Sequence, residues 1–139
     1  MQFPPAPRKE NMPLWKTPSG TDKLKIQPNT WTYVKFANLR NFPMPADGWS
    51  LVEATLRVEY PKTGCPKTLR GHFIRVADLD DTGNNDVNPI AGMVRHHHWQ
   101  HFLLNTPGLV LGFRVWHNGT VPITIDGRQF KTIAFTPKS

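Results

Sequence analysis

Alternation of apolar and polar side chains is the feature that most constrains the fold of this chain. Within residues 51–60 every second side chain is apolar or aromatic: Val52, Ala54, Leu56, Val58 and Tyr60. A second run covers residues 109–116, where one face carries Leu109, Leu111, Phe113 and Val115. Because successive side chains of a strand point to opposite faces, this period of two predicts half-buried strands. Other β-forming runs lie at 31–37, 69–77, 93–104, 121–125 and 129–136.

Turn-forming residues separate these runs. Asn118-Gly119 and Asp126-Gly127 each lie between two strand-like runs, and both pairs tolerate the positive φ of a type I′ turn. We therefore expect a hairpin at each pair. A further turn is expected at 105–108 and longer connections at 43–48 and 61–66, and no stretch has the period of an amphipathic helix. About seven short strands joined by turns predict an all-β protein, an antiparallel two-sheet sandwich.

Residues 1–28 differ from the rest of the chain. They hold Pro4, Pro5, Pro7, Pro13, Pro18 and Pro28, out of 14 prolines in all. Since proline fixes φ and removes a backbone donor, this stretch is expected to be an extended arm, followed by one sandwich domain over 29–139. Phe3, Leu14 and Trp15 are candidate partner-binding residues, because burying large apolar groups on another surface is favourable. The alternative is a disordered tail with incidental aromatics.

The bulk composition excludes several classes of protein. Cys65 is the single cysteine, so no intrachain disulfide forms, and 139 residues suffice for one core without staples. No secretory signal and no membrane-spanning run are recognisable, so membrane insertion is not expected. The formal charge of +7 favours anionic partners, but the cations are scattered and no nucleic-acid-binding motif is present. Nucleic-acid binding is therefore not expected as the main function.

A run of histidines, His96-His97-His98-Trp99-Gln100-His101, is the most conspicuous local motif. We take His96, His98 and His101 as candidate metal ligands. On a strand, His96 and His98 point one way and His101 the other, so further ligands from a neighbouring strand would be needed. Two alternatives stay open: a layer of imidazoles at a subunit axis, which protonation would weaken, and a polar strand face of hydrogen-bonded imidazoles.

An acidic segment over residues 78–86 offers a second candidate site. Asp78, Asp80 and Asp86 are candidate calcium ligands, because Asp78, Asp80 and Gly83 match the start of a calcium-binding loop. Pro89 stands where the closing bidentate Glu belongs. The alternative, a solvated polar loop between two strands, needs no cation.

Catalytic motifs are absent from the sequence. There is no Gly-x-Ser-x-Gly, no His-Glu-x-x-His and no phosphate-binding glycine loop, so we expect a non-enzyme without a resident cofactor. Five aromatic residues could include a stacking platform for sugars, although strand cores and interfaces use the same residue types: Tyr33, Trp49, Trp99, Phe113 and Trp116.

Three features of the chain together resemble a known family. They are Gly48-Trp49 opening a strand, Arg75 in a following strand, and Trp116-His117-Asn118 near the C-terminus. This layout, over residues 31–136, is similar to the tumour-necrosis-factor-like jelly-roll domains in small structural proteins of tailed bacteriophages. The histidine run and the long arm depart from that pattern.

The resemblance implies a jelly-roll homotrimer in the virion, assembled in the host cytoplasm together with other virion proteins. The expected types are a minor tail component, a capsid decoration protein or a receptor-facing knob, with the arm as anchor. The alternative from a different class is a carbohydrate-binding module that recognises a host surface glycan. Fold resemblance alone does not decide between these functions.

Overall fold

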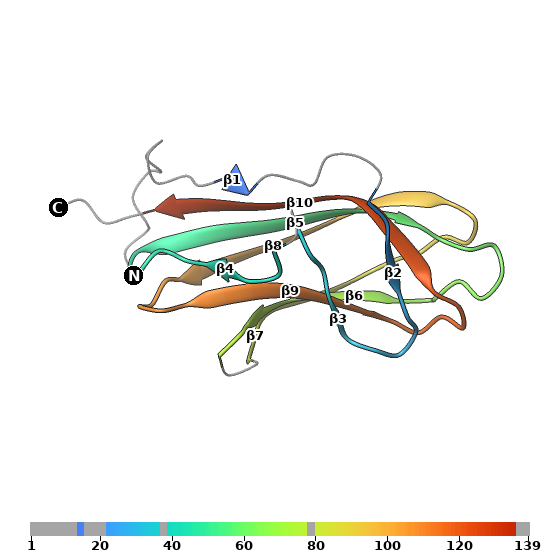
Figure 1. Cartoon of the computed structure of the whole chain (residues 1–139), viewed down its shortest axis with the longest axis horizontal. Helices are drawn as coiled ribbons and strands as arrows, with labels where there is room; N and C mark the ends of the chain where they lie inside the picture. The colour runs from blue at the N-terminus through green and yellow to red at the C-terminus, as the bar shows by residue number, and fades with distance from the viewer. Residues whose placement is uncertain (1–13, 16–21, 37–38, 78–79, 136–139) are drawn as a thin grey trace.

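A computed structural model describes residues 14–15, 22–36, 39–77 and 80–135, without the side chains of 14–15 and 80–84. The chain forms two antiparallel sheets packed face to face (Figure 1). The strands are β1 (Leu14–Trp15), β2 (Leu24–Ile26), β3 (Thr32–Tyr33), β4 (Phe42–Pro43), β5 (Trp49–Glu59), β6 (Leu69–Arg75), β7 (Asp80–Val87), β8 (Val94–Leu104), β9 (Val110–His117) and β10 (Ile123–Phe135).

The strand order is that of a jelly roll. The first sheet runs β1-β10-β5-β8, with β2 also paired to β10, and the second runs β3-β9-β6-β7, with β4 also paired to β9. From β7 onward each strand crosses to the other sheet, so β8, β9 and β10 alternate between the two layers. The prediction of an all-β antiparallel jelly-roll sandwich is confirmed.

The alternation read from the sequence sets which faces meet. Val52, Ala54, Leu56 and Val58 of β5 point inward, and so do Leu111, Phe113 and Val115 of β9. Five phenylalanines form the centre of the core, among them Phe42 and Phe130, whose rings stack 4.1 Å apart. Burial of each such side chain contributes about 1.5–3 kcal/mol.

Neither expected hairpin exists. Asn118-Gly119 joins β9 to β10, which belong to different sheets, so it is a crossover between layers. Asp126-Gly127 lies inside β10, where two residues oppose Arg57 in a bulge between the pairs Ile125–Val58 and Arg128–Leu56. The Asp126 carboxylate accepts a hydrogen bond from the Arg57 guanidinium, which holds the bulge in place. The runs 121–125 and 129–136 are thus parts of one strand.

The prediction of a loop over residues 78–86 is also wrong for most of that range. Residues from Asp80 onward form β7, an edge strand paired with β6 and interrupted by a bulge opposite Phe73 and Ile74. An edge strand needs only one paired neighbour, so its polar composition is compatible with strand geometry. Asp78 lies outside the described residues.

Part of the range 1–28 belongs to the sandwich. Leu24–Ile26 form the edge strand β2, Ile26 is buried, and Leu14–Trp15 pair with Lys131 and Phe130 of β10. The remaining residues up to 21 lie outside the described part of the chain. In that described part, no helix is long and apolar enough to cross a membrane.

Candidate functional site

Six large apolar side chains gather on the outer face of the first sheet, at the end where β10 stops. Register places Leu104, Trp49 and Phe135 in one row across β8, β5 and β10, and Phe102, Leu51 and Ile133 in the next row. All six sit at the outward positions of their strands, alternating with buried residues. We call these six residues the apolar patch.

Ring contacts join the apolar patch into one surface. Trp49 and Phe102 stack with ring centroids 5.2 Å apart, and Phe135 meets Phe102 edge-on at 5.9 Å. Phe102 is 42% exposed and Leu104 is 55% exposed. Contiguous apolar surface of this kind marks interaction sites more often than isolated exposed residues do.

A polar row borders the apolar patch. Gln100, Glu53 and Lys131 form the next row of the same face. The Gln100 side-chain amide donates to Glu53 over 2.7 Å, and the Lys131 ammonium lies 4.0 Å from the same carboxylate. An apolar centre bounded by polar residues is the usual anatomy of a protein interface.

Buried hydrogen bonds hold the strand ends under the apolar patch. The Ser50 hydroxyl donates to Oδ1 of the buried Asn105 over 2.9 Å. The Asn105 side-chain amide donates to the carbonyl of Asp47, and its backbone amide donates to Gly48. Asn105 therefore ties the start of β5 to the end of β8.

The outer face of the second sheet carries aromatic rings with stacked cations. The guanidinium of Arg114 lies 4.5 Å from the Trp31 ring centre, and that of Arg40 lies 4.7 Å from Tyr33. Arg70 lies 5.5 Å from Trp116. Trp31 and Trp116 are themselves 6.5 Å apart. We call this surface the arginine–aromatic face. Of the five aromatic residues considered as a sugar platform, Trp99 and Phe113 are instead buried in the core.

The histidine run is split between the two faces of β8. His96 and His98 are exposed on the outer face, and Nδ1 of His98 lies 3.1 Å from the Thr55 hydroxyl. His101 points inward and stacks against Phe73, with ring centroids 6.4 Å apart. Strand geometry thus keeps His101 away from the other two candidate ligands. Within the described residues, no group of three or more His, Cys, Asp or Glu side chains converges on a metal position.

The acidic candidates are likewise drawn apart. Asp80 and Asp86 lie at opposite ends of β7, about 20 Å apart at the rise of a strand. Asp86 accepts a hydrogen bond from Arg70 at 2.8 Å. Asp78 lies outside the described residues, as does Phe3 among the partner-binding candidates. Leu14 and Trp15 form β1, at the edge of the first sheet beyond β10.

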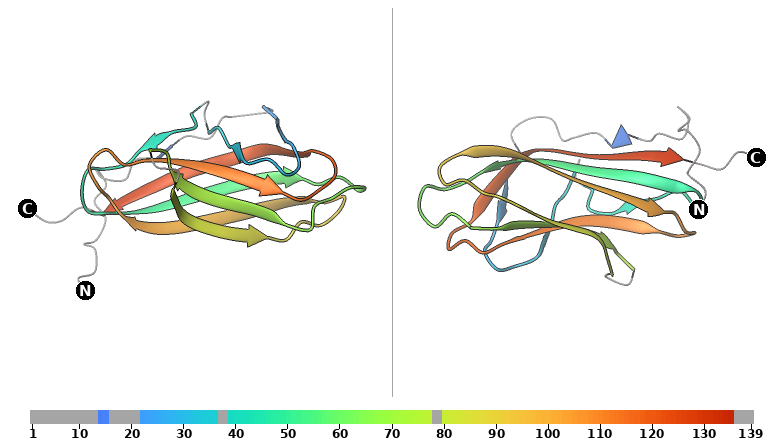
Figure 2. Two further views of the ribbon diagram at one scale, coloured as in Figure 1. Left: turned by 90° about the horizontal axis from the view of Figure 1, so that it is seen from below. Right: turned by 180° about the vertical axis from the view of Figure 1, so that it is seen from behind.

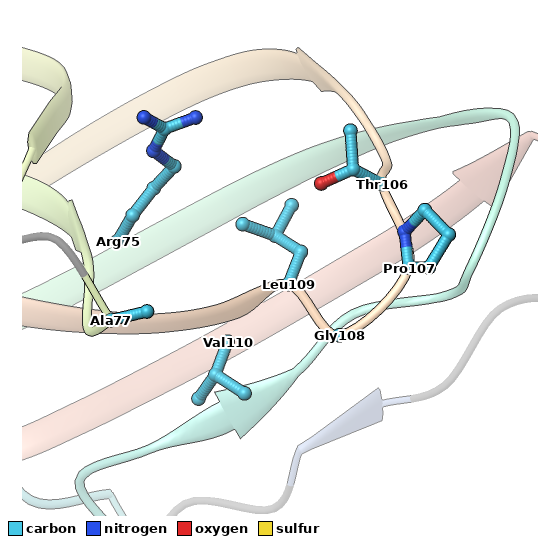
Figure 3. A pocket seen from close by; sticks show the side chains of 7 residues that line it. All are labelled: Arg75, Ala77, Thr106, Pro107, Gly108, Leu109 and Val110. Atoms are coloured by element: carbon cyan, nitrogen blue, oxygen red, sulfur yellow. The ribbon is translucent and has the colours of Figure 1, made fainter.

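One shallow cavity lies at the end of the second sheet (Figure 3). It has a volume of about 160 Å³ and is lined by the end of β6 and the residues just after it, by the β8–β9 turn and by the start of β9: Arg75, Ala77, Thr106, Pro107, Gly108, Leu109 and Val110. Another cavity of about 190 Å³ lies beside Glu59 and Tyr60. Both are smaller than the roughly 300 Å³ at which ligand pockets begin, and neither brings together an acid, a base and a nucleophile.

Sequence reasoning did not find the apolar patch. Its residues come from three strands far apart in the chain, and each alone looks like an incidental exposed hydrophobe. The one available signal was Leu51, an apolar residue on the polar face of residues 51–60. Only the register of β10, β5 and β8 brings the six together.

Solved structures share the fold of this chain. VP2 of infectious bursal disease virus, solved as a subviral particle, aligns with 89% of this chain at 7% identity and a TM-score of 0.58. A point mutant of that VP2 in T=1 particles aligns with 88% of this chain at 10% identity and a TM-score of 0.56. The chain spans 32% and 31% of these two VP2 chains.

A carbohydrate-binding module from the Cellvibrio mixtus lichenase 5A, solved with cellotriose, aligns less closely. It covers 93% of this chain and 98% of its own at 15% identity and a TM-score of 0.44. No protein-family model matches this chain, and no curated protein matches it in sequence. At these identities, the likeness to VP2 establishes the jelly-roll fold alone.

Proposed function

We propose that this chain is a structural protein of a virion, whose copies assemble through the apolar patch, and that it is not an enzyme. The apolar patch carries the proposal. Water contact with six clustered apolar side chains is unfavourable, and burial against a like surface recovers about 25 cal/mol per Å². The jelly-roll fold supports this proposal only in that such assemblies use it as a scaffold.

The proposal extends to a specific assembly. Three copies pack about a threefold axis, in a minor tail component or capsid decoration protein of a tailed bacteriophage. The arm, with Phe3, Leu14 and Trp15, attaches each copy to a neighbouring virion protein. Each copy is then a component of a virion that is assembled in the host cytoplasm. The first sheet offers its outer face for the threefold contact because its other face is the core.

Mass in solution tests the apolar patch. Leu51 lies at its centre, and Thr55 lies four residues along the same face of β5, outside it. Light scattering should give three copies of the 15.9 kDa chain, or a multiple of three. Leu51→Glu should abolish the threefold contact, and Thr55→Glu should preserve it. A monomeric wild-type protein, or a Leu51→Glu variant of unchanged mass, overturns the proposal.

Deletion tests the arm. Asp22 and Ile26 take part in the sandwich through contacts with Arg128 and His117, so the deletion ends at residue 21. It also removes β1, which adds only two residues to the edge of the first sheet. The variant lacking residues 1–21 should stay folded and trimeric but lose attachment to virions. Full occupancy on virions without these residues would refute anchoring by the arm.

A second function is favoured by the arginine–aromatic face. Trp31, Tyr33 and Trp116 share one sheet face, and such amphipathic rings offer an apolar surface on which a sugar ring can stack. We propose as the alternative a module that binds a host surface glycan there. A glycan array with and without calcium tests it, with Trp116→Ala as the variant. A blank array under both conditions rejects the alternative.

A further inference from the structure

The free edge of the first sheet is the long strand β8. Its eleven residues pair with β5 without any register shift, and β8 ends the strand path of that sheet. Figure 2 shows β8 along one border of the sandwich, on the same side as β7. An uncovered regular edge presents a row of unpaired backbone groups to any chain that can add a strand.

The other edges in the described part of the chain are protected in ways that β8 is not. β1, β2, β3 and β4 have two or three residues each, too few to template a partner strand. β7 is interrupted by a bulge and holds a glycine and three aspartates. β8 contains no proline, glycine or bulge, and Arg95 is its single charged residue. Short, bulged or charged edges resist pairing, whereas β8 lacks these defences.

The backbone hydrogen bonds show which groups β8 offers. The amide of Tyr60 donates to the carbonyl of Met93 just before β8, and the amide of Asn105 just after it donates to Gly48. In an antiparallel pair, hydrogen-bonded residues alternate, so the odd-numbered residues of β8 bond to β5. The backbone groups of the even-numbered residues therefore face the free edge: Val94, His96, His98, Gln100, Phe102 and Leu104.

We propose that β8 pairs with β8 of a second copy, antiparallel about a twofold axis at Trp99. This register overlaps the two strands along their whole length. It places Val94 opposite the partner's Leu104, His96 opposite the partner's Phe102, and His98 opposite the partner's Gln100.

Exposed side chains favour this register. Val94, Phe102 and Leu104 are 42%, 42% and 55% exposed, and they are the large apolar residues that β8 leaves in water. With the axis at Trp99, each of the two exposed strand ends meets the opposite end of the partner, so Val94 and Leu104 cover each other twice. A shift of two residues in one direction would pair Val94 with Phe102 and leave Leu104, the most exposed of the three, opposite Gly92, and a shift in the other direction would pair none of the three with one another. An isologous contact of this kind uses one surface on both copies.

The contact is distinct from the threefold contact of the proposed function, although it rests on the same premise that copies assemble. Edge pairing is made by the backbone of β8, whereas the apolar patch centres on Leu51, one strand further in. Phe102 and Leu104 border both contacts, and the substitutions at Leu51 and His98 avoid these two residues. Both contacts together give six copies or an extended assembly. Blocking either contact should leave the other, so their failures are distinguishable by mass.

The test uses proline at an edge amide. His98→Pro removes an amide that faces the free edge and leaves the β5 pairing intact, since proline is tolerated at such positions. His98→Ala removes the imidazole but keeps the amide, so it is the matched control. By light scattering or sedimentation of the full chain, His98→Pro should weaken the twofold contact about tenfold or more, and His98→Ala should leave it intact. Equal association of both variants overturns the proposal.

Cross-linking tests the register without altering an amide. A double variant, Val94→Cys with Leu104→Cys, should form intermolecular disulfides on oxidation, because these positions face each other in the proposed pairing. The pair Val94→Cys with Phe102→Cys is the control for a register shifted by two residues. Cross-linking of the control pair in preference to the first, or of neither, refutes the twofold register. If Leu51→Glu dissociates the assembly while proline at His98 changes nothing, the proposed function stands and the edge pairing fails.

Discussion

The hydroxyl oxygen of Tyr60 lies 2.7 Å from Nε2 of His97, and both side chains are buried. Burial raises the pKa of Tyr60 well above its usual range. Burial also lowers the pKa of His97 to about 4, and the nearby Arg95 and His96 add to the effect. At neutral pH the Tyr60 hydroxyl therefore donates to an unprotonated His97, and the pair links the end of β5 to β8.

The low pKa of His97 predicts a loss of stability in mild acid. The unfolded chain takes up a proton on this histidine near pH 6.5, whereas the folded protein resists protonation until about pH 4. The free energy of unfolding should therefore fall as the pH is lowered from about 6.5 towards 4. Burial lowers the pKa of His101 and His117 as well, in the same direction. Urea denaturation across this range measures the slope, which His97→Gln should reduce. An unchanged slope would contradict the prediction.

Removal of the Tyr60 hydroxyl should change both the stability of the fold and the pKa of His97. Tyr60→Phe keeps the ring but leaves Nε2 of the buried His97 without its donor, at a cost of about 1–3 kcal/mol. The pKa of His97 should rise, because the lost hydrogen bond favoured the neutral imidazole. NMR titration of the imidazole protons measures this. Tyr33→Phe, on the outer face, is the control and should change neither quantity appreciably.

Arg128 fastens the segment before β2 to the bulge of β10. Its guanidinium donates to the carbonyl of Lys35 at 2.5 Å, and to the carbonyl and carboxylate of Asp22 at 3.0 Å each. The side chain is 1% exposed, so the bonds are not replaced by water. Arg128→Lys cannot reproduce this fork and should lower the free energy of unfolding by about 2 kcal/mol or more.

A surface arginine provides the comparison for that measurement. Arg70 pairs with Asp86 at 2.8 Å, with both side chains more than a third exposed. Arg70→Lys should cost less than about 1 kcal/mol, as exposed pairs do. Equal costs for Arg128→Lys and Arg70→Lys in chemical denaturation would show that the buried fork adds nothing.

Gly71 of β6 makes room for Trp99. A Cβ on Gly71 would lie 2.4 Å from Cε2 of Trp99 and 2.8 Å from Cζ of Phe113. Trp99 cannot yield freely, because its indole N–H donates to the carbonyl of Asn85 at 3.1 Å. Gly71→Ala should therefore destabilise the sandwich by about 1–3 kcal/mol through overpacking. If the Gly71→Ala variant unfolds at the same temperature as the wild-type protein, the close contact is refuted.

The period-two pattern was sufficient to predict the all-β class and the buried faces of β5 and β9. Val52 to Val58 and Leu111 to Val115 point inward as expected, because alternation is a property of a single strand and needs no partner. The same pattern could not say which strands are neighbours. Asn118-Gly119 and Asp126-Gly127 have hairpin chemistry, yet one pair became a crossover between sheets and the other a bulge.

The candidate sites show the same difference between what a single strand determines and what the pairing of strands determines. His96 and His98 share the outer face of β8 and His101 takes the inner one, as strand geometry alone dictates. The apolar patch, in contrast, exists because Trp49, Leu104 and Phe135 fall into one row when β8, β5 and β10 pair. Local alternation depends only on neighbouring residues, whereas the pairing register of the strands depends on the packing of the whole core. The two faces of a single strand can therefore be predicted from the sequence, whereas a surface that combines several strands is formed only when the chain folds.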